Sequence, residues 1–231
     1  MLAELGMKYF TIVYFLTLLL STETGFTRPP ISGERYELLS GVRVLKDRNI
    51  PSGKAGMSDD FSTSVPSWFL TDNFHYIPTA GKVLDIYFKE GQNAVFLARK
   101  GFRVTGLENN PDLIEKANLL MKEFEVKINI VQENAYKFSS GDTLYDAVIA
   151  FYFTDRALLK KIWNWIKPGG ILILEGYTVL NRDTKEINSL SVEHFFKPGE
   201  LMSLFKDYKI LKYEEPLHLK VFTSSVIVQK R

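Results

Sequence analysis

The stretch GKVLDIYFKEGQNAVFLARKGFRVTGLENN, residues 81–110, decides the fold of this chain. Its apolar and loop residues predict a buried strand, a tight loop, a helix and a second strand, over residues 83–87, 88–91, 92–100 and 103–107. The second strand ends on the carboxylate of Glu108. A strand, loop, helix and strand that close on an acid about 20 residues after the first strand are typical of the nucleotide-binding half of a doubly wound sheet. The sequence therefore predicts an α/β fold.

The loop over 88–91 is the expected ligand site. Open parallel sheets bind ligands at the carboxyl ends of their strands, and this loop precedes a helix N-terminus, where backbone N–H groups are free to bind. Glu108 ends the neighbouring strand and is placed to accept hydrogen bonds from ribose hydroxyls. The two features together predict a nucleotide-like ligand at this edge of the sheet.

With several later segments, this unit resembles the class I S-adenosylmethionine-dependent methyltransferases, nearest the small single-domain type that includes tellurite-resistance-like methyltransferases. The resemblance covers roughly residues 66–213, and its motifs lie at 69–78, 83–98, 145–153, 166–178 and 196–215. Lys-Pro-Gly-Gly at 167–170, before an apolar run, is among the more specific signatures of this fold. The resemblance implies a doubly wound, seven-stranded, mostly parallel sheet with an antiparallel last strand, and S-adenosylmethionine as the cofactor.

The first loop departs from the family pattern at two positions. Family members usually carry three glycines, as G-x-G-x-G, after the Asp of the first strand. Here Asp85 and Gly91 are present, but Tyr87 and Lys89 stand at the first two glycine positions. A loop glycine allows a left-handed backbone and a close approach to the ligand, and another residue in that conformation costs roughly 1–2 kcal/mol. We therefore expect a cofactor pocket that is either reshaped or closed.

The resemblance assigns candidate cofactor-binding residues to the ends of the first three predicted strands. The third strand is predicted over 127–131, and Asn134 follows it. Family members commonly have an Asp there to accept the adenine amino group, and an amide oxygen can accept the same bond. A turn-forming Asn is the equal alternative. The full candidate set is Asp85, Tyr87, Lys89, Gly91, Glu108, Asn109, Asn134 and Ala135.

The catalytic residues stay open, with Tyr152, Asp155 and His194 as candidates. Family members place substrate-facing residues just after the fourth strand, predicted here over 145–153, where Tyr152 and Asp155 lie. Asp155 is also suited to cap a helix over 156–166. His194 lies in a polar segment, where it is either a general base or a solvated loop residue.

The remaining segments complete one domain. Residues 66–76 carry aromatic residues at near-helical spacing, and Pro66 suits a first helical turn. Asn110 is suited to cap a helix over 111–124. Further elements are predicted as a fifth strand at 171–175, a helix at 197–205 and two final strands at 208–215 and 218–229.

Composition excludes several classes of function. A net charge of +2 in 231 residues gives no electrostatic footprint for nucleic acid. The chain has no cysteine, so disulfides, thiolate catalysis and Cys-ligated metals are excluded. The G-x-G-x-x-G motif of nicotinamide enzymes, the G-x-S-x-G elbow, the Walker loop and a histidine pair at metal spacing are all absent. We therefore expect no nucleic-acid partner and no metal.

Residues 1–24 are predicted as a signal peptide or membrane anchor. Lys8 precedes an apolar run at 9–20, through which the chain would associate with a membrane. The run is shorter than the about 20 residues that cross a bilayer, and the alternatives are a helix packed on the domain or an over-extended gene start. Residues 25–65 are predicted as a linker or N-terminal cover, and 66–231 as the methyltransferase-like domain. If residues 7–24 are a signal, we expect a secreted, periplasmic or membrane-anchored protein. If they are not, we expect a cytoplasmic one.

Two functions remain open from the sequence. The first is a working methyltransferase that transfers a methyl group to an acceptor the sequence does not name. The second is a methyltransferase-fold protein that has lost cofactor binding and acts as a binding or envelope module. A secreted location and the altered loop favour the second, because S-adenosylmethionine is made in the cytosol. Tyr87 and Lys89 are the residues that discriminate between the two.

Overall fold

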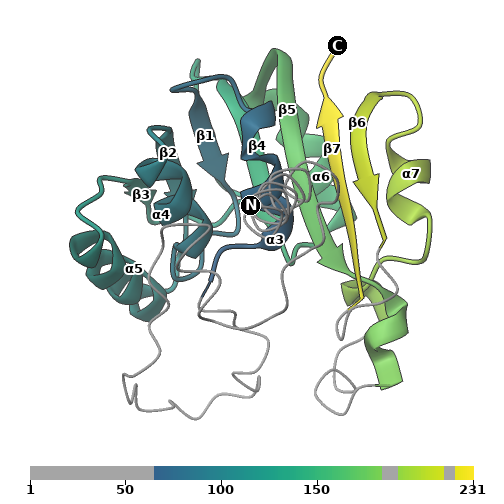
Figure 1. Cartoon of the computed structure of the whole chain (residues 1–231), viewed down its shortest axis with the longest axis horizontal. Helices are drawn as coiled ribbons and strands as arrows, with labels where there is room; N and C mark the ends of the chain where they lie inside the picture. The colour runs from purple at the N-terminus through teal and green to yellow at the C-terminus, as the bar shows by residue number, and fades with distance from the viewer. Residues whose placement is uncertain (1–64, 184–191, 216–221) are drawn as a thin grey trace, which may run out of the picture.

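A computed structural model describes residues 65–183, 192–215 and 222–231 (Figure 1). The predicted segment 1–24, and the predicted segment 25–65 except for its last residue, lie outside these ranges. Within the described part of the chain, no helix has both the length and the apolar character that a bilayer crossing needs.

The described residues form one seven-stranded sheet with the order β3-β2-β1-β4-β5-β7-β6. The strands are β1 (Lys82–Asp85), β2 (Arg103–Leu107), β3 (Asn129–Val131), β4 (Tyr145–Phe151), β5 (Ile166–Tyr177), β6 (Lys209–Glu214) and β7 (Thr223–Gln229). Strands β1 to β5 pair in parallel, and β7 runs antiparallel to both β5 and β6. Figure 1 shows the carboxyl ends of the parallel strands at the lower edge of the sheet. This architecture confirms the predicted fold class.

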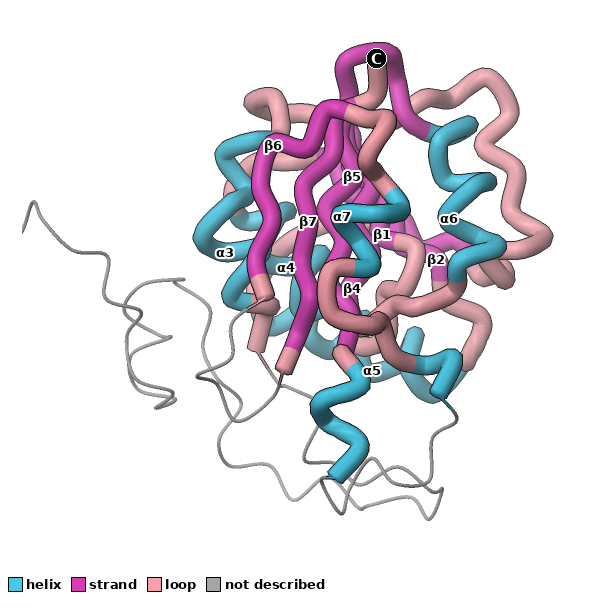
Figure 2. Tube along the Cα trace, turned by 90° about the vertical axis from the view of Figure 1, so that its right-hand side faces the viewer, coloured by secondary structure: helices cyan, strands magenta, loops and turns pink. Residues whose placement is uncertain are grey.

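Helices cover both faces of the sheet. They are α3 (Trp68–Asn73), α4 (Gln92–Arg99), α5 (Pro111–Glu123), α6 (Arg156–Ile162) and α7 (Glu200–Leu204), with short 3₁₀ turns η2 (Phe74–Tyr76), η3 (Trp163–Trp165), η4 (Val179–Asp183) and η5 (Val192–His194). Figure 2 shows α3 and α4 on one side of the strands and α6 and α7 on the other. Buried residues of α5 join the cluster formed by α3 and α4. The result is the three-layer arrangement that a doubly wound sheet requires.

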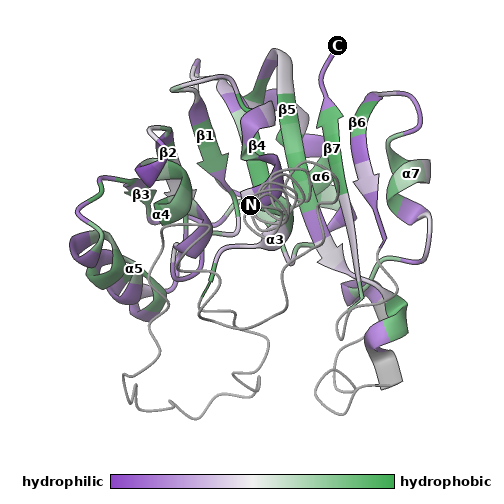
Figure 3. Ribbon diagram, viewed as in Figure 1, coloured by the Kyte–Doolittle hydropathy of each residue, from purple (hydrophilic) through white to green (hydrophobic). Residues whose placement is uncertain are grey.

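The core consists of two apolar layers separated by the sheet. Val83 and Ile149 face the layer that contains Phe96 of α4, whereas Leu84 and Val148 face the layer of α6. Figure 3 shows the apolar residues concentrated along β4, β5 and β7, while α5 alternates between apolar and polar residues. Burial on both faces explains why the strands read as nearly continuous apolar runs in the sequence.

Two strands of the predicted site end earlier than expected, at turns. β1 ends at Asp85 and not at residue 87, because the Asp85 carboxylate accepts a hydrogen bond from the Tyr87 N–H and closes a turn. β4 ends at Phe151 and not at residue 153, because Tyr152 adopts a left-handed backbone with φ of 56°. Both side chains that were expected inside strands therefore lie in loops at the carboxyl edge.

Other boundaries also differ from the prediction. β5 already begins at Ile166, so the Lys-Pro-Gly-Gly turn forms an irregularity inside this strand, where the register with β4 shifts. The helix predicted over 197–205 is shorter, since Gly199 with φ of 73° holds the turn that precedes Glu200. Pro66 lies before the first turn and not in it, because Ser67 caps α3 by accepting a hydrogen bond from the Phe69 N–H.

The two predicted N-caps are confirmed. Asn110 accepts a hydrogen bond from the Asp112 N–H at the start of α5. Asp155 accepts bonds from the Ala157 and Leu158 N–H groups at the start of α6. These caps fix where two helices begin at the carboxyl edge of the sheet.

Candidate functional site

The loop between β1 and α4 is anchored by one buried aromatic side chain. Phe88 is 2% exposed, and its ring lies against the bare Cα of Gly106 on β2, where a Cβ would meet the ring at 2.2 Å. The Phe88 N–H also donates to the Leu107 carbonyl. Because Phe88 points into the core, its neighbours Tyr87 and Lys89 are less buried than Phe88 itself. The same residue therefore fixes the loop and displays the two positions that depart from the family pattern.

Tyr87 and Lys89 differ in backbone conformation. Lys89 has φ of 51°, the left-handed region that favours glycine, whereas Tyr87 is not among the residues with positive φ. The Tyr87 side chain is 45% exposed and lies edge-on to the Phe153 ring, with centroids 6.3 Å apart. Conformational strain from the missing glycines therefore falls on Lys89 alone.

The Lys89 ammonium lies over two phenol rings. Its Nζ is 4.9 Å from the centroid of the Tyr87 ring and 5.4 Å from that of the Tyr152 ring. Tyr152 in turn stacks on Tyr177 of β5 with centroids 5.0 Å apart, and burial raises the pKa of Tyr177. We call Tyr87, Tyr152 and Tyr177 the aromatic cluster. It joins the loops after β1 and β4 to the end of β5.

Glu108 ties the loop to the end of β2. Its Oε2 accepts a hydrogen bond from the Lys89 N–H at 3.1 Å, and its Oε1 accepts bonds from the Asn109 and Asn110 N–H groups, each at 2.9 Å. An ionised carboxylate offers about four acceptor positions. The backbone amides use three of them, so Glu108 retains capacity for a ligand hydroxyl while it is held in place.

Asp85 carries a buried oxygen atom without a partner. The side chain is 1% exposed, and its Oδ2 finds no hydrogen-bond donor among the residues that the structure describes. Burial raises the pKa of Asp85 to about 7, with a further increase from the Glu108 charge, while the Tyr87 N–H and the Lys89 charge lower it. Buried polar atoms are nearly always hydrogen-bonded, so this oxygen points to a ligand with a donor group.

The residues after β3 lie at the surface. Asn134 is exposed, and its Oδ1 accepts a hydrogen bond from the Tyr136 N–H at 2.8 Å. The turn-forming role that the sequence left as an alternative is therefore present. An amide oxygen has a second lone pair, so the same atom is able to accept one further bond. Ala135 beside it is half-buried.

The three candidate catalytic residues lie on segments that meet at the carboxyl edge. Asp155 uses Oδ1 to cap α6, and His194 is exposed in η5. Arg156, the first residue of α6, donates to the backbone carbonyls of Glu193 and Phe195, one on each side of His194. This arginine brings the segment of His194 to the start of α6, while Tyr152 belongs to the aromatic cluster.

Two polar groups that hold this edge together were not found from the sequence. The buried Glu175 of β5 accepts hydrogen bonds from the Ser67 and Ser225 hydroxyls, both at 2.8 Å. The Arg156 guanidinium also pairs with Glu200 of α7 at 2.6 Å. The partners are 44 to 108 residues apart in the chain, and no local pattern signals such distant contacts.

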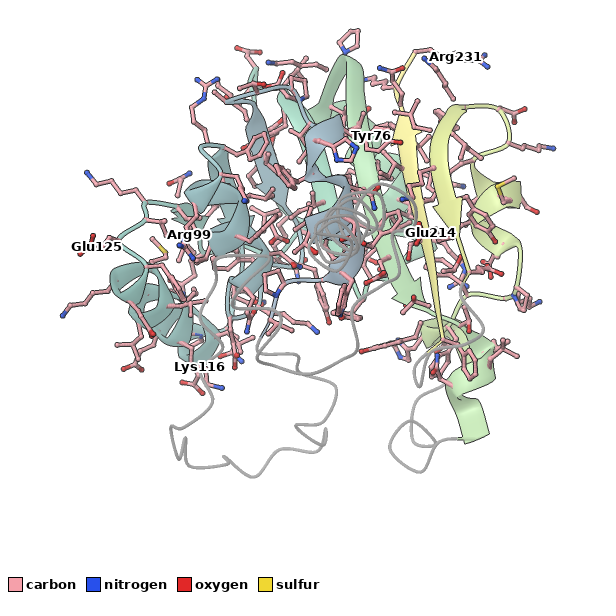
Figure 4. The ribbon with its side chains drawn as sticks, viewed as in Figure 1. Tyr76, Arg99, Lys116, Glu125, Glu214 and Arg231 are labelled. Carbon is pink, nitrogen blue, oxygen red and sulfur yellow. The ribbon has the colours of Figure 1, made fainter. Side chains whose placement is uncertain are left out.

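A neighbouring ion pair involves Glu90 instead of Lys89. Lys116 of α5, labelled in Figure 4, pairs with Glu90 Oε1 at 2.6 Å, and Gln92 donates to Oε2 of the same carboxylate. Lys89 forms no salt bridge with any residue in the described ranges. The Lys89 ammonium therefore contacts the rings of Tyr87 and Tyr152 and not a carboxylate.

The chain is similar to known methyltransferases. A family model described as a methyltransferase domain matches residues 83–170. The ubiquinone biosynthesis O-methyltransferase of Rickettsia akari (strain Hartford) is 28% identical over 150 residues, which cover 56% of this chain and 58% of that protein. The chain spans about half the length of the curated relatives it matches, from 43% to 58%.

Solved structures share the fold. TehB from Haemophilus influenzae superposes with a TM-score of 0.60 at 20% identity, over 75% of this chain and 65% of that one. The plantazolicin methyltransferase BpumL, solved in complex with SAH, has a TM-score of 0.54 at 15% identity, over 71% of this chain and 82% of that one. The family model and the curated relatives support a methyltransferase domain of the class I S-adenosylmethionine-dependent kind, whose cofactor is S-adenosylmethionine, and the sheet order and the solved structures agree with the fold of that family.

Proposed function

We propose that this chain is a working methyltransferase, which binds S-adenosylmethionine at the carboxyl edge of β1 and β2 and transfers its methyl group to an acceptor. The observation that carries the proposal is the pair of acids at that edge. Asp85 has a buried oxygen that needs a donor, and Glu108 is fixed by three backbone amides with an acceptor position left. The alternative, a fold that has lost its cofactor, has no support from the relatives.

The residues present fit the cofactor. Its ribose has hydroxyl donors for Glu108, and its methionine ammonium is a donor for the orphaned oxygen of Asp85. Asn134 keeps a lone pair for the adenine amino group. Tyr87, at the first altered glycine position, is 45% exposed. Tyr87 and Lys89 both place a new group near Glu108, whose charge acts on the phenol and on the ammonium.

The cofactor supplies a methyl group on a sulfonium, which is already activated as a leaving group. The protein therefore contributes mainly proximity and orientation, which are worth several kcal/mol of the barrier. Glu108 and Asp85 would hold and orient the cofactor. A general base is optional in such a reaction.

Among the catalytic candidates, Tyr152 has the best position. It follows β4 directly and contacts Lys89 through its ring. Asp155 is engaged as a helix cap, which favours a positioning role over proton transfer. His194 is exposed and has its neighbours held by Arg156, so it is the available base for an acceptor that needs one.

The proposal is tested by ligand-dependent melting. S-adenosylhomocysteine at about 100 times its Kd should raise the Tm by about 5–10 °C, because ligand binding to the folded state adds roughly 2.7 kcal/mol. Glu108→Ala should abolish this rise, each variant being compared with its own ligand-free melting curve.

Asp146→Asn is the matched control. Asp146 also accepts a backbone N–H, from Lys82, and pairs with Lys167, but it lies at the opposite end of β4. This variant should keep the full ligand-induced rise. If millimolar S-adenosylhomocysteine leaves the Tm of the unmodified protein unchanged, the proposed function is wrong and the non-catalytic alternative stands.

A further inference from the structure

Lys89 places a positive charge where the family has a glycine, and the charge lies in surroundings suited to a cation. Its Nζ is within 5.4 Å of the centroids of two phenol rings, Tyr87 and Tyr152. The face of an aromatic ring attracts a cation. The structure thus contains a site for a single positive charge at the carboxyl edge, and a lysine of the protein fills it.

The backbone around this contact is strained at both ends. Lys89 and Tyr152 both have a left-handed backbone, with φ of 51° and 56°. They belong to loops after different strands, yet their side chains meet. Such a conformation is unfavourable for a residue other than glycine and persists when the surrounding structure holds it there. Two strained residues whose side chains contact each other indicate a binding site and not a chance contact at the surface.

The carboxylates near Lys89 would also suit another cation in place of its ammonium. Burial lowers the pKa of the Lys89 ammonium, against the opposing charges of Glu108, Glu90 and Asp85. Glu90 already pairs with Lys116. The two carboxylates that remain are the pair assigned above to the cofactor, so Lys89 and the cofactor face the same acids.

We infer that the Lys89 ammonium lies in the site that receives the sulfonium of the cofactor, so that its charge weakens the binding of S-adenosylmethionine more than the binding of S-adenosylhomocysteine. The inference rests on the proposed function. A sulfonium is a single positive charge without hydrogen-bond donors, and ring faces with nearby carboxylates are what recognise it. The sulfur of S-adenosylhomocysteine is neutral. Two positive charges a few ångströms apart repel each other, so Lys89 would make the site discriminate against the charged ligand.

The experiment compares the two ligands, which differ by one methyl group and one charge. Calorimetric titration gives the Kd of each for the unmodified full chain and for Lys89→Met. We expect Lys89→Met to tighten binding of S-adenosylmethionine by about tenfold relative to S-adenosylhomocysteine, the scale of one partly screened charge pair. Lys89→Arg keeps the charge and should leave the ratio of the two Kd values as in the unmodified protein.

A second pair of variants tests the rings. In the Lys89→Met background, Tyr152→Leu should weaken S-adenosylmethionine more than S-adenosylhomocysteine, whereas Tyr152→Phe retains a ring and should not. Circular dichroism checks that each variant is folded, and Lys89→Gly replaces Lys89→Met if the latter is unstable.

The outcomes separate this inference from the proposed function. An unchanged ratio of Kd values in Lys89→Met overturns the inference and leaves the function intact. Equal weakening of both ligands also overturns it, because Lys89 would then bind a group common to both, such as the methionine carboxylate. If neither ligand binds to any variant, the proposed function fails and the inference fails with it.

Discussion

At the scale of single residues, the altered loop changes charge more than it changes shape. Tyr87 needs no left-handed backbone, so its substitution for glycine carries no conformational cost. Lys89 keeps the conformation that a glycine would have, with φ of 51°. The loop has therefore retained its backbone path while it acquired a ring and an ammonium. The family pattern located this position, but only the structure separates the strained residue from the unstrained one.

Lys89→Gly should be more stable than Lys89→Ala by about 1–2 kcal/mol, because both variants lack the ammonium and only alanine retains the strain. Urea unfolding of the two variants measures the difference. The same pair of substitutions at Lys160, an exposed position inside α6, should give the opposite order by about 1 kcal/mol. Equal stability of the two Lys89 variants would show that the loop is not strained.

At the scale of elements, β2 and the loop after β1 fit together through a missing side chain. The Phe88 ring occupies the space where a Cβ of Gly106 would be, and its Cζ also lies 2.9 Å from the Cβ position of Gly91. Both glycines thus serve the packing of one ring. The sequence gives no sign that Gly106 is needed inside its strand, because the ring that packs against it comes from another element.

Gly106→Ala should therefore lower the free energy of unfolding by about 1–3 kcal/mol through overpacking. Phe88→Leu is the partner variant in a double-mutant cycle, followed by denaturant unfolding. We expect the alanine to cost clearly less in the leucine background, since the smaller side chain leaves room for it. Strictly additive costs would mean that the ring and the glycine do not constrain each other.

At the scale of the whole molecule, one buried acid links stability to pH. Burial raises the pKa of Asp85 from 3.8 to about 7. Between these values the unfolded chain loses its proton first, so unfolding is favoured as the pH rises, and the loss is complete above the folded pKa. A shift of this size corresponds to roughly 4 kcal/mol. The site thus contains a destabilising group that a ligand donor would relieve.

Asp85→Asn should remove the loss of unfolding free energy that ionisation of Asp85 causes as the pH rises. Relative to the unmodified protein, the variant should gain up to about 4 kcal/mol of unfolding free energy between pH 4 and pH 8, measured by urea unfolding at each pH. Asp146→Asn is the comparison variant, for which the change of stability with pH should have the opposite sign. Although partial burial opposes it, the Lys167 hydrogen bond holds the pKa of Asp146 below its ordinary value, so that variant should lose stability as the pH rises. A pH-independent difference for Asp85→Asn would contradict the assignment.

The sequence predicted what depends on local chemistry. Asn110 and Asp155 were found as caps because a cap bonds residues two or three positions away, and the seven-stranded sheet with an antiparallel last strand followed from the family resemblance. The Ser67, Glu175 and Ser225 group was not found, since its members are brought together by three different elements. The left-handed backbone of Tyr152 was also missed, because an aromatic residue gives no signal for it. The local caps and the sheet architecture were thus predictable, and the contacts between residues far apart in the chain were not.

The antiparallel direction of β7 has a practical consequence. Because this last strand runs against β5, it ends at the amino edge of the sheet, and Arg231 lies there, across the sheet from Glu108 and Asp85 (Figures 1 and 4). A tag or a surface tether attached after Arg231 would therefore lie at the edge opposite the proposed cofactor site. Immobilising the protein by this end leaves the opposite edge open to solution, which suits it to surface-based detection of small molecules.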